Sequence, residues 1–215
     1  MTPDWNAARR RMVDDQLRRR GIRDERVLEA MGRIPREEFV PAAARRSSYG
    51  DDPIGIGCGQ TISQPYMTAF MAELLQLEGA ETVLDVGGGS GYHAAVLGAL
   101  AARVVSIEII PELAAMASDN LARTNLGGNV TVICGDGSRG WAELAPYPRI
   151  SVAAGAPEAP SALIEQLADP GRLVIPVGDL EDQELLVLDK RGGAVDRHVA
   201  GYCRFVPLRG GGGWK

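Results

Sequence analysis

A short glycine-rich loop constrains the fold of this chain more than any other stretch. The apolar segment TVLDV (82–86) runs into GGGSG (87–91), and the helical pattern YHAAVLGALA follows at once. Glycines between a buried strand and a helix permit unusual backbone angles and let a ligand approach the main chain. In an open α/β sheet, ligands bind beyond the carboxyl ends of the strands. The loop therefore predicts a ligand site at the end of the first core strand.

Strand and helix patterns alternate through the rest of the chain. This alternation indicates βαβ units and a mostly parallel sheet with helices on both faces. The last two apolar runs, 183–191 and 198–208, are expected to form antiparallel strands. The other expected strands cover 103–109, 129–136, 149–155 and 171–178, and the expected helices cover 111–125 and 161–168. The predicted fold class is α/β, with a doubly wound, mostly parallel seven-stranded sheet and an N-terminal helical extension.

The first third of the chain has helical and loop patterns instead. One helix is expected over 6–21, ended by a glycine, and a second over 23–34 with Asp24 as its N-cap. Residues 35–59 are rich in proline and glycine and are expected to form an extended loop. A third helix is expected to begin at Pro65, because proline is favoured in the first helical turn.

Length, charge and cysteine content limit the classes of protein. The 215 residues fit one domain, in which 1–78 form a helical and loop cap and 79–215 form the core and the C-terminal strands. The formal net charge of -5 disfavours nucleic acid and anionic membranes as partners. Three separated cysteines without a Cys/His cluster argue against structural zinc and fit a reducing compartment. With no apolar N-terminal segment and no run of about 18 apolar residues, a cytoplasmic protein is expected. We also expect a monomer without a metal ion.

The spacing of the glycines distinguishes two kinds of ligand loop. A nicotinamide-binding loop has the pattern GxGxxG, but here Tyr92 stands where the last glycine would be. The pattern present is GxGxG, which resembles the binding loop of Rossmann-like S-adenosylmethionine methyltransferases. Glu108 ends the next strand, where its carboxylate can accept bonds from ribose hydroxyls, and Asp136 follows the third strand, where it can accept from an adenine amino group. The predicted cofactor-binding residues are Gln60, Thr61, Asp85, Gly87, Gly88, Gly89, Ser90, Gly91, His93, Glu108, Asp136 and Gly137.

The segment GQTISQPY (59–66) carries many neutral hydrogen-bonding groups and no charge. Methyl transfer from a sulfonium is an in-line displacement, so the protein must chiefly position and desolvate the reactants. A carboxylate nucleophile, with a pKa of about 4, is already ionised at neutral pH and needs no base. Neutral donors that orient an anion suit such an acceptor, and neither His93 nor His198 has an obvious catalytic context.

Several motifs, taken in order, identify a family. The chain resembles protein-L-isoaspartate (D-aspartate) O-methyltransferases from about Met12 to Trp214. This resemblance implies the class I methyltransferase fold and S-adenosyl-L-methionine as the cofactor, with S-adenosyl-L-homocysteine as its product. It also implies methyl esterification of the α-carboxyl of L-isoaspartyl, and in some cases D-aspartyl, residues in damaged proteins, where the ester cyclises to a succinimide. The motifs are FVP (39–41), GQTISQPYM (59–67), GSGY (89–92), SIE (106–108), GDG (135–137) and RFVPLRGGGGW (204–214).

The resemblance also implies roles for residues on the acceptor side. Ser63 is the expected catalytic residue, whose hydroxyl bonds the substrate carboxylate with help from Thr61, without a covalent intermediate. The same serine can cap the helix that begins at Pro65. The other expected substrate-binding residues are Ile62, Gln64, Tyr66, Val206, Pro207 and Leu208.

This chain departs from the family pattern on the cofactor side. The family usually has glutamate, threonine and glutamine where this chain has Asp85, Gly88 and His93, and a threonine is missing from VAAGAPEAP (152–160). These changes bear on efficiency more than on reaction type. Two alternatives stay open: a carboxyl methyltransferase that modifies an aspartate of one dedicated peptide, and a non-catalytic cofactor-binding protein. The acidic balance of the chain argues against a nucleic-acid methyltransferase.

Overall fold

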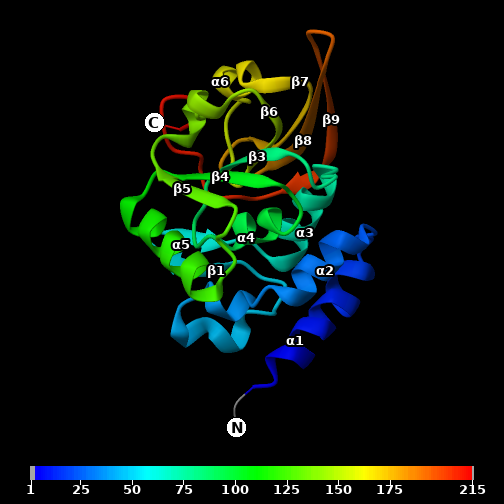
Figure 1. Ribbon diagram of the computed structural model, residues 1–215, viewed down its shortest axis with the longest axis vertical. Helices are drawn as coiled ribbons and strands as arrows, with labels where there is room; N and C mark the ends of the chain where they lie inside the picture. Colours follow the sequence, from blue (N-terminus) through cyan, green and yellow to red (C-terminus); the bar gives the residue numbers. More distant parts are fainter. Residues whose placement is uncertain (1–2, 215) are drawn as a thin grey trace.

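The computed structural model describes residues 3–214. Residues 1–2 of the predicted cap (1–78) and residue 215 of the predicted core (79–215) lie outside the described residues. One seven-stranded sheet forms the centre of the structure, in the order β5-β4-β3-β6-β7-β8-β9 (Figure 1). Strands β3 to β7 run parallel, whereas β8 is antiparallel to β7 and to β9. The predicted fold class and the antiparallel final strands are confirmed. The strands are β3 (Thr82–Val86), β4 (Arg103–Glu108), β5 (Val130–Cys134), β6 (Tyr147–Val152), β7 (Leu167–Gly178), β8 (Gln183–Arg191) and β9 (Ala194–Cys203).

The helices begin and end largely where the sequence predicts. The Asp24 carboxylate accepts a hydrogen bond from the Arg26 N–H and caps the second helix, and Pro65 is the first residue of the third. The first helix continues from α1 into a π-helical turn, Met12–Arg18. The α-helices are α1 (Trp5–Arg11), α2 (Glu25–Arg33), α3 (Pro65–Leu74), α4 (Tyr92–Gly98), α5 (Pro111–Thr124) and α6 (Ser161–Glu165).

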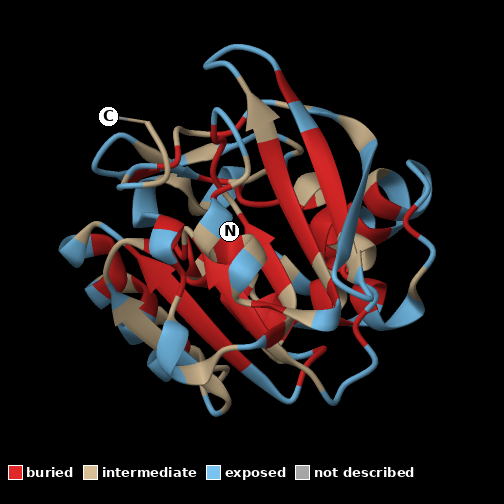
Figure 2. Ribbon diagram, turned by 90° about the horizontal axis from the view of Figure 1, so that it is seen from above, coloured by how far each residue is buried: buried red, intermediate tan, exposed pale blue. Residues whose placement is uncertain are grey.

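Apolar side chains cover the sheet on both faces. Val83 and Val104 pack with the N-terminal helices and with α3, α4 and α5. Leu84 and Val105, their neighbours along the same strands, point to the opposite face and pack with Tyr147 and α6. Side chains alternate between the two faces of a strand, so near-continuous apolar runs are required where both faces are covered. Figure 2 shows the resulting buried strands in red at the centre of the molecule.

Two expectations about local structure were wrong, and one hairpin was not predicted. Residues 35–59 are not one extended loop: they contain two 3₁₀ helices, Arg36–Glu38 and Ala42–Ser47, and the strand β1 (Ile54–Gly57). Strand β1 pairs with β2 (Gln60–Ile62), which makes the uncharged segment a hairpin. The last strand ends at Cys203, and the chain after it leaves the sheet. Short 3₁₀ turns and three-residue strands carry too little periodicity to be read from sequence.

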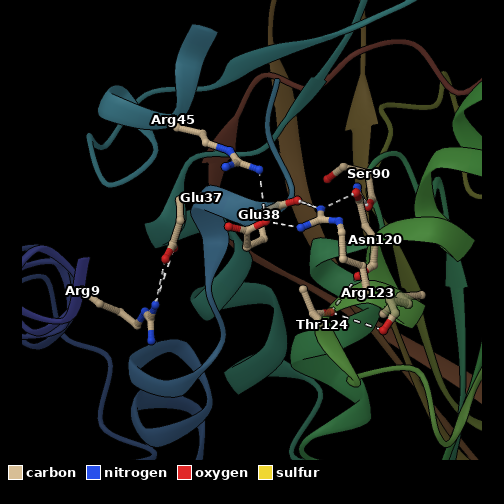
Figure 3. A network of polar contacts seen from close by, with 9 residues as sticks. Arg9, Glu37, Glu38, Arg45, Ser90, Asn120, Arg123 and Thr124 are labelled. Atoms are coloured by element: carbon tan, nitrogen blue, oxygen red, sulfur yellow. Dashed lines mark hydrogen bonds and ion pairs between the residues drawn. The ribbon is translucent and has the colours of Figure 1, made fainter. Parts of the chain in front are cut away.

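A polar network joins the N-terminal segment to the core (Figure 3). Arg123 on α5 donates to the backbone carbonyl of Glu38 at 2.6 Å and pairs with its carboxylate, which Arg45 also contacts at 3.1 Å. Asn120, one turn earlier on α5, donates to the Ser90 carbonyl at 3.0 Å. Helix α5 therefore links the N-terminal segment to the glycine loop. Within residues 3–214, no helix is long and apolar enough to cross a membrane.

Candidate active site

A cleft lies at the carboxyl ends of β3, β4 and β6, where the strand order reverses on the two sides of β3. Ligands of open α/β sheets bind at such a switch point. The cleft contains about 530 Å³ of empty space, part of it open to solvent. Its lining residues are Gln60, Thr61, Val86, Gly87, Gly89, Ile107, Glu108, Ile109, Ile110, Gly137, Ala153, Ala154, Val206, Pro207, Leu208 and Arg209.

The glycine loop is fastened to the end of β4. The N–H groups of Gly87 and Gly88 donate to the Ile107 carbonyl at 2.9 and 3.1 Å. Gly87 and Gly89 have φ angles of 89° and 54°, a region that side chains other than glycine rarely adopt. A Cβ atom on Gly89 would lie 3.3 Å from Ile56 of β1, so the hairpin packs directly on the loop. The glycines thus permit both the turn and the close approach of the hairpin.

Glu108 combines a structural and a ligand-facing position. It lines the cleft yet is only 5 % exposed. One carboxylate oxygen accepts from the Gly89 N–H at 2.8 Å, and the other from the Ile110 N–H at 2.9 Å. A carboxylate has about four acceptor positions, so each oxygen keeps capacity for a further donor. Glu108 can therefore hold the glycine loop and accept bonds from two hydroxyls of a ligand at once.

A second, inner cavity of about 330 Å³ of empty space adjoins the cleft and reaches Ser63. The Oγ atom of Ser90 and Nε2 of His93, both among its lining residues, are buried without a hydrogen-bond partner in residues 3–214. Unpaired buried polar atoms are costly, so the cavity suits a polar ligand. The cavity is lined by Thr61, Ile62, Ser63, Thr68, Gly87, Gly88, Gly89, Ser90, Tyr92, His93 and Ala153.

Ser63 lies between β2 and α3, where the backbone changes direction. Its carbonyl accepts a hydrogen bond from Arg36 at 2.7 Å. Gln64, not Ser63, is the N-cap residue of α3, and the side chain that accepts from the first turn of the helix is that of Asp51, which accepts from the Tyr66 N–H at 3.3 Å. The expected capping role of Ser63 is therefore not observed, and its hydroxyl is left for the cavity. Thr61, two residues earlier, lines both the cleft and the cavity.

Asp85 lies beneath the loop and does not line either cavity. It is fully buried, accepts a bond from the Ser106 hydroxyl at 2.8 Å, and lies 3.6 Å from Nδ1 of His93. Burial raises the pKa of Asp85 and lowers the pKa of His93, because both charged forms lose their water. The prediction that Asp85 binds the cofactor directly is not supported: its side chain instead supports the loop through Ser106 and His93.

Gly88 makes room for this buried contact. A Cβ atom at residue 88 would lie 2.6 Å from the Ser106 hydroxyl oxygen. Gly88→Ala should therefore displace Ser106 from Asp85 and lower the free energy of unfolding by about 1–3 kcal/mol, as expected when a buried polar group loses its partner. Chemical denaturation of purified protein measures this loss.

Ser106→Ala provides the matched background for this prediction. Once the hydroxyl is gone, adding Gly88→Ala should cost much less than it does in the wild-type protein, because the steric conflict has been removed. An equal cost of Gly88→Ala in both backgrounds would contradict the assigned conflict.

Asp136 is engaged by the C-terminal tail. Its two carboxylate oxygens accept from the backbone N–H of Ser138 at 3.0 Å and of Gly211 at 2.8 Å, and Arg139 lies 3.2 Å away. Asp136 does not line the cleft, whereas Gly137 does. The predicted contact from Asp136 to an adenine amino group is not supported, because the tail already occupies the carboxylate.

This anchor should depend on pH. Burial alone would raise the pKa of Asp136, but hydrogen bonds from Gly211 and Ser138 outweigh burial and lower it. A carboxyl with a lowered pKa stabilises the fold above its ordinary value of about 3.9, and this contribution is lost as pH falls through the lowered value. The tail should stay anchored at neutral pH and loosen only below about pH 4. The emission of Trp214, taken as the difference between wild-type protein and Trp214→Phe, reports the anchor.

Asp136→Asn removes the ionisable group from this contact. Its Trp214 emission at pH 7 should resemble that of the wild-type protein at low pH, and the acid-dependent change should disappear. Identical emission from both proteins across the titration would show that Asp136 does not anchor the tail.

The remaining acceptor-side predictions divide into two groups. The segment 206–208 lines the cleft because Val206 O and Leu208 N bond to Gly155, each at 2.8 Å. Gln64 and Tyr66 do not line the cleft or the inner cavity, and Tyr66 stacks instead on Phe70 at 5.6 Å between ring centroids. Gly91, a predicted cofactor-binding residue, also lines neither cavity. It packs against α5 instead, where a Cβ atom at residue 91 would lie 3.1 Å from the backbone of Ala117. Sequence reasoning missed Val86, Ile107, Ile109, Ile110, Thr68, Tyr92, Ala153, Ala154 and Arg209.

The residues present fit S-adenosyl-L-methionine. Gly87, Gly89 and Gly137 form a cradle without side chains, and a Cβ on Gly137 would lie only 2.6 Å from Val86. Glu108 supplies a carboxylate with free acceptor positions for hydroxyls. Apolar residues from the ends of β3, β4 and β6 complete the cleft, as is usual for cofactor sites. Among residues 3–214 no group of three or more metal-ligating side chains is gathered.

Comparison with known proteins gives one consistent result. The family model of protein-L-isoaspartate(D-aspartate) O-methyltransferase matches residues 8–212. Similar curated proteins are the protein-L-isoaspartate O-methyltransferase of Koribacter versatilis, 54 % identical over 96 % of this chain and 93 % of that protein, and protein-L-isoaspartate O-methyltransferase 2 of Marinobacter nauticus, 55 % identical over 98 % and 97 %. A putative protein-L-isoaspartate O-methyltransferase from Plasmodium falciparum, solved with S-adenosyl-L-homocysteine, superposes with a TM-score of 0.80 at 26 % identity, covering 97 % of this chain and 99 % of that one. The match over nearly the whole length, on a cleft with the geometry described above, places this chain in the protein-L-isoaspartate (D-aspartate) O-methyltransferase family.

Proposed function

We propose that this protein transfers the methyl group of S-adenosyl-L-methionine to the α-carboxyl of L-isoaspartyl residues, with D-aspartyl residues as a further candidate substrate, in damaged proteins. The ester then cyclises to a succinimide, whose hydrolysis returns part of the chain to normal aspartate. Family membership over residues 8–212 supports this function. The observation that carries it is the connection between the cleft and the inner cavity, which share Thr61, Gly87, Gly89 and Ala153.

This connection matches the needs of the reaction. A cofactor held over the glycines supplies an activated methyl group, so the chain itself must place a carboxylate in line with it. Ser63, on the inner cavity, donates its hydroxyl proton to the substrate carboxylate in a hydrogen bond, and Thr61 stands between the two cavities. A hydrogen bond to a charged group is about twice as strong as a neutral one and fixes its direction. No general base is needed, because the acceptor is ionised at neutral pH.

Two of the walls of the inner cavity are buried side chains. Ile62 and Tyr92 are 6 % and 1 % exposed, and both line the cavity. Exclusion of water strengthens the hydrogen bonds that orient the carboxylate. Val206, Pro207 and Leu208 form the wall of the cleft next to Gly155, where an extended peptide can lie.

The wider setting of this activity is part of the same proposal. We expect the protein to act as a monomer in the cytoplasm, on isoaspartyl-containing proteins and peptides, without a metal ion and without nucleic acid or membrane as a partner. We also expect residues 1–78 to act as a cap that carries the acceptor segment and 79–215 as the cofactor-binding core. The net charge of -5 supports the expectation about nucleic acid.

The test uses methyl-labelled S-adenosyl-L-methionine and a pair of synthetic peptides of equal sequence. One peptide contains L-isoaspartate and the other normal aspartate at the same position. We expect a base-labile methyl ester on the isoaspartyl peptide and essentially none on its partner, for several unrelated flanking sequences. Binding of cofactor without any ester would indicate a non-catalytic protein, and methylation of normal aspartate in a single sequence would indicate a dedicated peptide substrate.

A further inference from the structure

Arg36 is the largest fully buried side chain of residues 3–214, and the mechanism above does not use it. It lies at the start of the 3₁₀ helix Arg36–Glu38, far from the cofactor loop in sequence. Its Nε donates to the Ser48 carbonyl and its Nη2 to the Ser63 carbonyl, each at 2.7 Å. Its guanidinium also lies over the ring of Tyr92, 4.9 Å from the centroid. Two of its three contacts, Ser63 and Tyr92, are walls of the inner cavity.

The charge of Arg36 is only partly balanced: the Asp51 carboxylate acts to raise its pKa, but that carboxylate pairs directly with Arg20. Arg36 forms no ion pair within residues 3–214, and its Nη1 atom is buried without a hydrogen-bond partner. The two acidic residues that follow it are engaged elsewhere, Glu37 with Arg9 and Glu38 with Arg45 and Arg123. Burial lowers the pKa of Arg36, but arginine keeps its proton in proteins. A buried cation without a directly paired counter-charge is unfavourable, so a further negative charge nearby would stabilise it.

The substrate carboxylate, which accepts the methyl group in the proposed reaction, carries a negative charge of this kind. The Ser63 hydroxyl is separated from the Arg36 guanidinium by one hydrogen bond and the atoms of a single residue, at most about 8 Å, and a carboxylate bonded to that hydroxyl lies about 3 Å further on. At that distance in a buried site, the attraction between opposite charges remains substantial. We propose that Arg36 is a positioning residue that holds the backbone of Ser63 and supplies the positive charge that makes the inner cavity select an anionic acceptor. This inference rests on the proposed function and adds a source of specificity to it.

The neutral donors of the acceptor segment do not provide this selection alone. A hydroxyl can donate to a carboxylate and to the carbonyl of an uncharged amide, and its preference for the charged group is modest. The positive charge behind Ser63 adds to this preference, because it stabilises only the ionised ligand. Arg36 therefore favours an isoaspartyl carboxylate over the same group in amidated form.

The experiment compares two ligands in the presence of S-adenosyl-L-homocysteine. One is an isoaspartyl peptide with a free α-carboxyl, and the other is the same peptide with that carboxyl converted to an amide. In the wild-type protein we expect the acid to bind about tenfold or more tightly than the amide by calorimetry. In Arg36→Met, the ratio should fall to within about threefold, while the Kd of S-adenosyl-L-homocysteine stays within about threefold of its wild-type value.

Two further variants separate charge from packing. Arg36→Lys keeps the charge but not the planar fork that holds two carbonyls, so it should keep most of the acid preference while kcat falls about tenfold or more. Arg46→Met removes the same charge from an exposed position on the neighbouring 3₁₀ helix and should leave the ratio unchanged. If Arg36→Met fails to fold, the ratios of acid to amide binding in the wild-type protein and in Arg36→Lys are sufficient to test the proposal.

The proposal is overturned in either of two ways. The first is equal binding of acid and amide by the wild-type protein. The second is a variant result of the wrong sign, either an unaltered acid preference in a folded Arg36→Met or a lost acid preference in a folded Arg36→Lys. Both outcomes are compatible with methyl ester formation by the wild-type protein, so they differ from a failure of the proposed function, which would abolish ester formation itself.

Discussion

Ser63→Ala is expected to lower kcat/KM for an isoaspartyl peptide by about 10–150-fold, mostly through kcat, with little change in cofactor affinity. The factor corresponds to the loss of one hydrogen bond to a charged group, about 1.5–3 kcal/mol. The Ser63 hydroxyl lines the inner cavity and has no role in capping α3, so its removal should leave the fold intact. Steady-state kinetics and calorimetry with S-adenosyl-L-homocysteine measure the two effects separately.

Ser161→Ala is the matched control, because Ser161 is exposed on the first turn of α6 and lies outside both cavities. It should behave as the wild-type protein in both assays. If Ser63→Ala instead weakened cofactor binding by the same factor as it lowers kcat/KM, the hydroxyl would act on the cofactor, and its assignment to the acceptor would be wrong.

The parts of the fold that sequence predicts well are those encoded by local pattern. The run from β3 through the glycine loop into α4 is legible because a buried strand, a turn and a helix follow one another within about twenty residues. The register of parallel strands then brings Val86 beside Ile107, which places Glu108 next to the loop. The strand ends therefore predicted the place of the cleft and of Glu108, but not the positions of Asp85 and Asp136, which do not line it.

The parts that were missed depend on contacts between distant segments. Asp136 was predicted at the end of a strand over 129–136, but β5 ends at Cys134, and Gly211, 75 residues after Asp136, donates to its carboxylate. Arg36 reaches Ser63 across 27 residues, and no periodicity marks that pair. In the β1–β2 hairpin, β1 has four residues, two of them glycines, and β2 has three, so neither alternation nor β-propensity reveals it. Such contacts become visible only once the chain is folded.

Asp85, Gly88 and His93 gain a common explanation from the structure. In sequence they are three separate departures from the family pattern, but in space Asp85 contacts Ser106 and lies beside His93, and Gly88 leaves the volume that Ser106 occupies. The shorter acid Asp85, the glycine at residue 88 and the imidazole of His93 thus belong to one compact arrangement beneath the loop. The departures alter the support of the cofactor loop, while the acceptor residues Thr61 and Ser63 keep the family pattern.

Glu108→Ala is expected to have the largest effect on cofactor binding, raising the Kd of S-adenosyl-L-homocysteine by about 10²–10³-fold. Two contributions add. The ligand loses a carboxylate acceptor, and the Gly89 and Ile110 N–H groups lose the partners that hold the glycine loop. Each hydrogen bond to a charged group contributes about 1.5–3 kcal/mol, so partial loss of two such contributions accounts for the range. Calorimetry measures the Kd, and the KM of the peptide at saturating cofactor should change far less.

Two variants test whether the carboxylate itself is responsible. Glu112→Ala removes the same charge from the exposed first turn of α5 and should bind cofactor normally. Glu108→Gln keeps one acceptor oxygen but turns an NH₂ group toward a backbone N–H, so its Kd should lie between those of the wild-type protein and Glu108→Ala. A wild-type Kd in Glu108→Ala, with the loss appearing in peptide KM instead, would assign Glu108 to the acceptor and reverse the two sides of the site.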